Sequence, residues 1–122
     1  MAKILLAEDD DMSRDIIRTR LARNGHEVIA VCNGQECVEK AGTEPFDIFI
    51  LDLSMPIKDG IQTLKELKTR PDTAGKPAMA LSAHSMERDR KKAIDAGFDD
   101  FDTKPINLLR LLEKISSLLG KT

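Results

Sequence analysis

The sequence contains no tryptophan, no tyrosine and only four phenylalanines in 122 residues. Aromatic platforms on which single-stranded nucleic acids could stack are therefore scarce. The chain also lacks an excess of positive charge, because 19 lysines and arginines stand against 21 aspartates and glutamates, a net charge of −2. Nucleic-acid binding needs a clear basic excess. We therefore expect no nucleic-acid partner.

Cysteines and long apolar segments are also few. Cys32 and Cys37 are five residues apart with no other thiol, which excludes a disulfide framework and the spacing of a zinc site. The apolar run 4–7 is far too short for the core of a signal peptide or for a membrane span. We therefore expect a cytoplasmic protein without membrane insertion, whose length allows one compact domain.

Short apolar segments alternate with amphipathic segments along the whole chain. Residues 4–6 and 48–51 are continuous apolar runs, as in strands buried on both faces. The predicted strands are 3–7, 27–31, 47–51, 78–81 and 99–102; the predicted helices are 12–24, 34–41, one that follows Gly60, 85–96 and 107–119. Parallel strands need crossover connections and are covered on both faces. The pattern therefore predicts an α/β fold, a five-stranded parallel sheet that is doubly wound, (βα)5.

Local sequence signals predict where two helices begin and which faces of two helices are apolar. Asp10 and Asp11 suit the start of the first helix, where negative charge complements the macrodipole. Asn33 is a candidate N-cap of the second helix, and Glu36 predicts a capping box with it. The first helix has apolar Ile16, Ile17 and Leu21 at helical spacing. The last helix has the strongest apolar stripe: Leu108, Leu111, Leu112, Ile115 and Leu119.

Polar side chains follow four of the five predicted strands: Glu8 and Asp9, Asp52, Ser82, and Lys104. In an open parallel sheet, the chemistry lies beyond the carboxyl ends of the strands, so we expect these groups to converge. Two carboxylates about 4 Å apart repel by about 4 kcal/mol at an effective dielectric near 20, so three need a cation, a raised pKa or both. Oxygen ligands with room for water favour Mg²⁺. A metal and an ammonium would attract a phosphoryl group, and Asp52 is the best candidate nucleophile for forming an acyl phosphate.

Four segments then carry a family resemblance. They are Leu-Ala-Glu-Asp at 6–9, Asp-Leu-Ser-Met-Pro-Ile-Lys-Asp-Gly at 52–60, Leu-Ser-Ala at 81–83 and Phe-Asp-Thr-Lys-Pro at 101–105. With these motifs in order, the chain resembles the response regulator receiver domain of two-component signalling from end to end. More loosely, it resembles stand-alone regulators of the DivK type. The resemblance implies the flavodoxin-like receiver fold.

The resemblance also implies roles for the acidic residues. Asp52 would be the phosphoacceptor, taking a phosphoryl group from a sensor histidine kinase or a histidine phosphotransfer protein. Asp9, Asp52 and the backbone carbonyl of Ser54 would ligate Mg²⁺, with Mn²⁺ as the alternative ion. Glu8 would contribute mainly through water, and it stands where the family more commonly has aspartate.

Further roles follow for the other motif residues. Lys104 would pair with the phosphoryl group, and its bond to Pro105 is a candidate cis peptide bond. Ser82 would be the switch hydroxyl and Phe101 the switch aromatic, at a position where the family often has tyrosine. His84, two residues beyond Ser82, occupies a position that can tune hydrolysis of the acyl phosphate.

These expectations predict a signalling phosphoacceptor and no enzyme beyond self-phosphorylation and autodephosphorylation. We expect 1–122 to be a single receiver domain without an output domain, acting on a downstream protein through a changed surface at 85–96, 99–102 and 107–119. One alternative is a phosphorelay intermediate or phosphate sink. Another is an aspartyl-phosphate phosphohydrolase, which is disfavoured because Ser54 stands where a general acid is required. A flavodoxin-like FMN binder is disfavoured by the absence of tryptophan and tyrosine.

Overall fold

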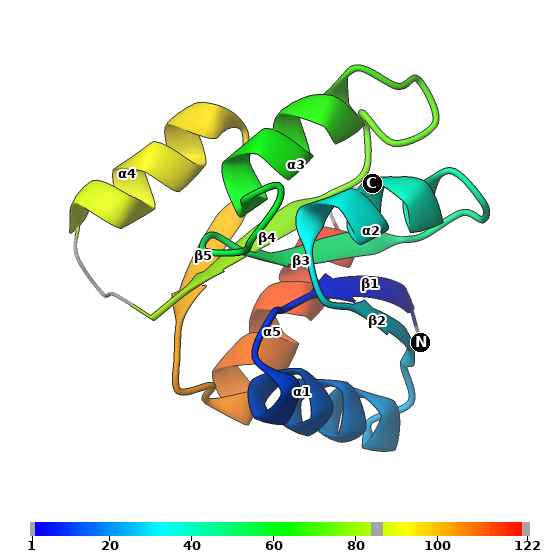
Figure 1. Cartoon of the computed structure of the whole chain (residues 1–122). Coiled ribbons are helices and arrows are strands. Elements are labelled where there is room, and N and C mark those ends of the chain that lie inside the picture. The colour runs from blue at the N-terminus through cyan, green and yellow to red at the C-terminus, as the bar shows by residue number, and fades with distance from the viewer. Residues whose placement is uncertain (1, 84–86, 121–122) are drawn as a thin grey trace.

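The computed structural model describes residues 2–83 and 87–120. Its strands are β1 (Lys3–Ala7), β2 (Glu27–Val31), β3 (Ile48–Asp52), β4 (Ala78–Ser82) and β5 (Asp100–Thr103). Its helices are α1 (Asp11–Arg23), α2 (Gly34–Ala41), α3 (Gly60–Lys68), α4 (Glu87–Ala96) and α5 (Leu108–Leu119) (Figure 1). All strand pairs are parallel, and the sheet order is β2-β1-β3-β4-β5. The predicted α/β fold with a doubly wound five-stranded sheet is confirmed.

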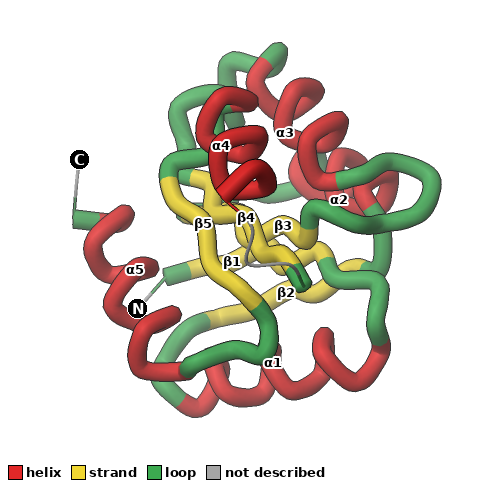
Figure 2. The backbone as a smooth tube through the Cα atoms, turned by 90° about the vertical axis from the view of Figure 1, so that its left-hand side faces the viewer, coloured by secondary structure: helices red, strands yellow, loops and turns green. Residues whose placement is uncertain are grey.

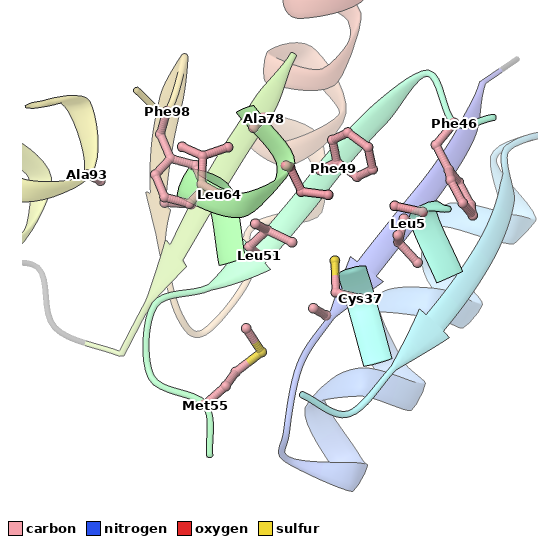
Figure 3. Packing of buried hydrophobic residues seen from close by; sticks show 14 of the residues in the cluster. Leu5, Cys37, Phe46, Phe49, Leu51, Met55, Leu64, Ala78, Ala93 and Phe98 are labelled. Atoms are coloured by element: carbon pink, nitrogen blue, oxygen red, sulfur yellow. The ribbon is translucent and has the colours of Figure 1, made fainter. Parts of the chain in front are cut away.

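The sheet separates two hydrophobic cores. Helices α2, α3 and α4 cover one face, and α1 and α5 cover the other (Figure 2). Leu5 and Leu6 are adjacent in β1 and contribute to opposite cores, because successive strand side chains point to opposite faces. Figure 3 shows the first core, in which Leu5 and Leu51 of the sheet lie near Cys37 of α2. Burial raises the pKa of the Cys37 thiol to about 12.

The central strands explain the continuous apolar runs of the sequence. All residues of β3 and β4 are buried, whereas the edge strand β2 is only partly covered. The strand register brings their carboxyl ends level, because Ala7 pairs with Leu51 and Asp52 pairs with Leu81. The residues that end β1, β3 and β4 therefore lie at one edge of the sheet.

The strand boundaries differ slightly from the prediction. The predicted strands stop at 51 and 81, but Asp52 and Ser82 are the last residues of β3 and β4. β5 is Asp100–Thr103, one residue later than predicted. The reason is that backbone pairing continues past the point where the side chains turn polar, as the pairing of Ser82 with Thr103 shows.

Helix caps account for most helix starts. Asp10 caps α1 by accepting a hydrogen bond from the backbone N–H of Ser13. Asn33 caps α2 through the N–H of Glu36, but the capping box predicted with Glu36 is wrong. The Glu36 carboxylate instead accepts a hydrogen bond from the backbone N–H of Cys32 at 3.0 Å. A capping box is present at the start of α3, between Asp59 and Gln62.

The faces of the outer helices follow their apolar positions. Ile17 and Leu21 of α1 are buried, whereas Ile16 is 41 % exposed. On α4 only Ala93 is buried. The predicted start of this helix at 85 and His84 lie outside the described residues. In the described part of the chain, no helix has both the length and the apolar character to cross a membrane.

Candidate functional site

The polar residues of the site lie at the carboxyl ends of three strands. Glu8 and Asp9 directly follow β1, Asp52 is the last residue of β3, and Lys104 directly follows β5. Glu8 and Asp52 are almost completely buried, whereas Asp9 is exposed. They are four of the five residues that the sequence predicts to converge at the carboxyl edge of the sheet, and the fold brings these four together.

Lys104 lies between the two buried carboxylates. Its Nζ is 2.7 Å from Oε1 of Glu8 and 2.9 Å from Oδ2 of Asp52. Burial opposes the charge of the Lys104 ammonium, but the hydrogen bonds to Asp52 and Glu8 outweigh it, so the pKa of Lys104 is raised. One cation thus compensates two buried acids.

Glu8 has an unusual environment for a carboxylate. Its pKa is raised to about 7: burial is the main cause, the neighbouring Asp52 adds to it, and the hydrogen bond from Lys104 acts in the opposite direction. Its Oε2 accepts a hydrogen bond from the backbone N–H of Asp10 at 3.1 Å. The crowding of carboxylates is therefore relieved by both predicted means, a cation and a raised pKa.

The three acids also form a set of oxygen ligands that suits a hard metal ion. Glu8, Asp9 and Asp52 each offer one carboxylate oxygen, and these oxygens lie within 4.8 Å of one another. An all-oxygen donor set with an exposed member suits Mg²⁺, which retains several water ligands. The donor chemistry therefore fits the ion that the sequence predicts.

Asp52 is held from a second side. Its Oδ1 accepts a hydrogen bond from the backbone N–H of Ser54 at 3.0 Å. Ser54 lies in the loop that leads to α3 and lines, with Ser82 and Lys92 of α4, a cavity of about 240 Å³. Ser82 is buried at the end of β4, so the predicted switch hydroxyl lies in the wall of this cavity.

The two remaining predicted residues lie on β5 and beyond it. Phe101 is buried and belongs to the core that includes Ala93 of α4. The peptide bond between Lys104 and Pro105 is cis. Phe101 therefore packs inside the protein in this structure, on the α4 side of the sheet.

Two features near the site were not predicted from the sequence. Arg14 of α1 donates a hydrogen bond from Nη1 to the backbone carbonyl of Glu8 at 3.0 Å. Asp102 is buried and accepts hydrogen bonds from the Arg110 guanidinium, with Nε at 2.9 Å, while its Oδ2 has no hydrogen-bond partner among the residues that the structure describes. The three-residue spacing of Arg14 from Asp11 along a helix signals their ion pair, but it does not signal the contact of Arg14 with the Glu8 carbonyl. Nothing comparable in the sequence marks Asp102 as buried.

Comparison with known proteins decides the family. The sequence model of one protein family, the response regulator receiver domain, matches residues 4–116, which is nearly the whole chain. The chain belongs to this family. The acidic cluster of Glu8, Asp9 and Asp52 is typical of a receiver active site. The chain is thus a response regulator receiver domain of two-component signalling, and this part of the prediction is confirmed.

Curated relatives of this receiver include longer proteins. Response regulator RR06 of Streptococcus pneumoniae is 37% identical over 118 residues, which cover 97% of this chain and 53% of RR06. The alkaline phosphatase synthesis transcriptional regulatory protein PhoP of Bacillus subtilis is 31% identical over 98% of this chain and 49% of its own length. The chain therefore spans about half the length of these two relatives.

A solved relative bears on the metal. The receiver domain of the sensor histidine kinase PA1611 from Pseudomonas aeruginosa superposes with a TM-score of 0.92 at 27% identity, covering 98% of both chains. That structure has a magnesium ion coordinated in its active site cleft. The predicted receiver fold is confirmed by this similarity.

Proposed function

We propose that the chain takes a phosphoryl group from a sensor histidine kinase or a histidine phosphotransfer protein onto Asp52, with Mg²⁺ as the required ion and Mn²⁺ as the alternative. The observation that carries the proposal is the setting of the Asp52 carboxylate. It is buried at the end of β3, held by Lys104 and by the N–H of Ser54, and lies beside the acids Glu8 and Asp9.

The chemistry follows from these groups. A carboxylate oxygen of Asp52 attacks the phosphorus, the bond from phosphorus to the donor's histidine nitrogen breaks, and the released imidazole takes up a proton. The Lys104 ammonium neutralises charge on the transferred phosphoryl oxygens. Glu8, Asp9, Asp52 and the carbonyl of Ser54 would hold the metal, which when bound supplies further positive charge at those oxygens.

We assign the output to Ser82 and Phe101. The Ser82 hydroxyl donates a hydrogen bond to a phosphoryl oxygen, and Phe101 adjusts its packing beneath α4. The contact of Lys114 with β5 supports a link to α5, because its Nζ donates a hydrogen bond to the carbonyl of Phe101 at 2.6 Å. The changed surface then includes α4, β5 and α5, and its target is another protein.

The same site allows self-phosphorylation and autodephosphorylation without making the chain an enzyme for other substrates. A second candidate is a phosphorelay intermediate or phosphate sink. The similarity to the receiver domain of the sensor histidine kinase PA1611 favours it, because that receiver is part of a kinase. A phosphohydrolase remains disfavoured, because Ser54 carries a hydroxyl where a second acid is needed.

Intact-mass measurement tests the proposal. Wild-type chain incubated with Mg²⁺ and a small phosphodonor such as acetyl phosphate should gain one phosphoryl group, and Asp52→Asn should gain none. Asp10→Asn is the matched control, since Asp10 is a nearby acid that acts as an N-cap and asparagine caps equally well. Labelling of Asp52→Asn at the wild-type rate would overturn the assignment.

A further inference from the structure

Arg14 joins the first helix to the turn that carries the acidic residues. Its Nη1 donates a hydrogen bond to the backbone carbonyl of Glu8 at 3.0 Å, and its Nη2 lies 2.5 Å from Oδ1 of Asp11. The Arg14 side chain is about three-quarters buried. A guanidinium can make both contacts at once because its donors form a rigid planar fork.

The contacted carbonyl belongs to the peptide unit that links Glu8 to Asp9. On the other side of that turn, the Glu8 N–H donates to the carbonyl of Val31 at 3.1 Å. The Asp10 N–H donates to the Glu8 side chain, and Asp10 itself caps α1. Arg14 therefore completes the set of contacts that fixes this short turn. Fixing the peptide unit fixes the direction in which the Asp9 side chain leaves the backbone.

We propose that Arg14 is a positioning residue for the metal ion. By holding the Glu8–Asp9 peptide unit, it keeps the carboxylates of Glu8 and Asp9 within reach of the Asp52 carboxylate. This inference rests on the proposed function, because it concerns the same Mg²⁺ site. Partners that orient metal ligands without touching the metal typically contribute 10–100-fold to affinity.

A purely electrostatic role and a positioning role of Arg14 predict opposite changes in Mg²⁺ affinity when Arg14 is replaced. A guanidinium near a cation site repels the ion, so removing its charge would strengthen Mg²⁺ binding if charge alone mattered. If Arg14 positions the ligands, removing it weakens Mg²⁺ binding in spite of the lost repulsion. The sign of the change therefore separates the two explanations.

The experiment compares Arg14→Met with Arg18→Met. Arg18 makes the same kind of contact within α1, with its Nη2 2.5 Å from Oδ1 of Asp15 three residues earlier, and it is the matched control. Methionine retains much of the aliphatic stem and removes the charge and the donors. We expect Mg²⁺ affinity, from NMR titration of backbone amides, to fall about tenfold for Arg14→Met and to stay within about twofold for Arg18→Met.

Arg14→Lys is the second variant and preserves the charge. We expect it to bind Mg²⁺ several-fold more weakly than wild type, because one ammonium cannot reproduce the two-pronged contact. If Arg14→Met does not fold, the Mg²⁺ affinity of Arg14→Lys still tests the positioning role. Unchanged or tighter Mg²⁺ binding by Arg14→Met or Arg14→Lys would overturn the positioning role and leave the proposed function intact. A wild-type chain that binds no Mg²⁺ would overturn both.

Discussion

The ammonium of Lys104 lies 2.9 Å from Oδ2 of Asp52, although 52 positions separate the two residues in the chain. The same ammonium lies 2.7 Å from Oε1 of Glu8, so one lysine is shared by two buried acids. A metal ion that used the Glu8 oxygen would have to compete with Lys104 for it. Lys104 and a bound metal ion would therefore be alternative counter-charges for this Glu8 oxygen, whereas a phosphoryl group on Asp52 would need both.

Replacing Lys104 by methionine should separate these effects. In the presence of EDTA, Lys104→Met should lower the free energy of unfolding by about 3 kcal/mol, because two buried carboxylates lose their cation. Mg²⁺ should bind the variant more tightly than wild type, since no ammonium competes for Glu8. Urea unfolding and Mg²⁺ titration by calorimetry measure the two quantities.

Lys91→Met serves as the control for that substitution. Lys91 is an exposed lysine of α4, 3.6 Å from the exposed Asp95, and exposed pairs contribute little to stability. The unfolding free energy and the Mg²⁺ affinity of Lys91→Met should match those of the wild type. Equal stability of Lys104→Met and Lys91→Met in EDTA would contradict the view that Lys104 compensates the buried acids.

The pKa of Glu8 predicts how stability depends on pH without metal. Burial raises this pKa from 4.5 to about 7, so between these values the folded protein binds the proton more tightly than the unfolded chain. The stabilisation is fully present below pH 4.5 and is lost as the pH rises through about 7, by at most about 3 kcal/mol. The difference in unfolding free energy between wild type and Glu8→Gln, measured in EDTA, should therefore fall from pH 5 to pH 8. A difference that is flat or rises over this range would refute the environment assigned to Glu8.

The sequence was sufficient to predict the order and type of the elements. The runs around Leu5 and Ile50 are apolar without alternation because those strands are buried on both faces, and such strands are recognisable from one sequence. The residues at which the strands end were less predictable. Asp52 and Ser82 are polar yet pair within the ladder, because hydrogen bonding of the backbone does not depend on side-chain polarity.

The members of the candidate site were also predictable, because residues after parallel strands must meet at one edge of the sheet. Which of these side chains form hydrogen bonds with one another was not predictable. That Lys104 bonds Glu8 as well as Asp52 depends on side-chain conformations and distances that exist only in the folded chain. The same holds for Glu36, whose carboxylate reaches Cys32 and not its predicted partner Asn33.

Gly60 offers a test of how closely the loop after β3 must approach the phosphoacceptor. A Cβ at Gly60 would lie 2.5 Å from the carbonyl oxygen of Asp52 and 2.9 Å from Cα of Leu53, both backbone atoms that cannot move independently. Gly60→Ala should therefore cost about 1–3 kcal/mol of stability and slow labelling of Asp52 by a small phosphodonor, because the end of β3 must shift.

Gly75→Ala is the matched control for this substitution, since a Cβ there would meet nothing within 4 Å. Its effect on stability should lie within about 1 kcal/mol and favour the folded state, because alanine restricts the unfolded chain. Thermal unfolding and intact-mass labelling of both variants provide the comparison. If Gly60→Ala were as stable and as readily labelled as Gly75→Ala, the loop would not need its close approach to Asp52.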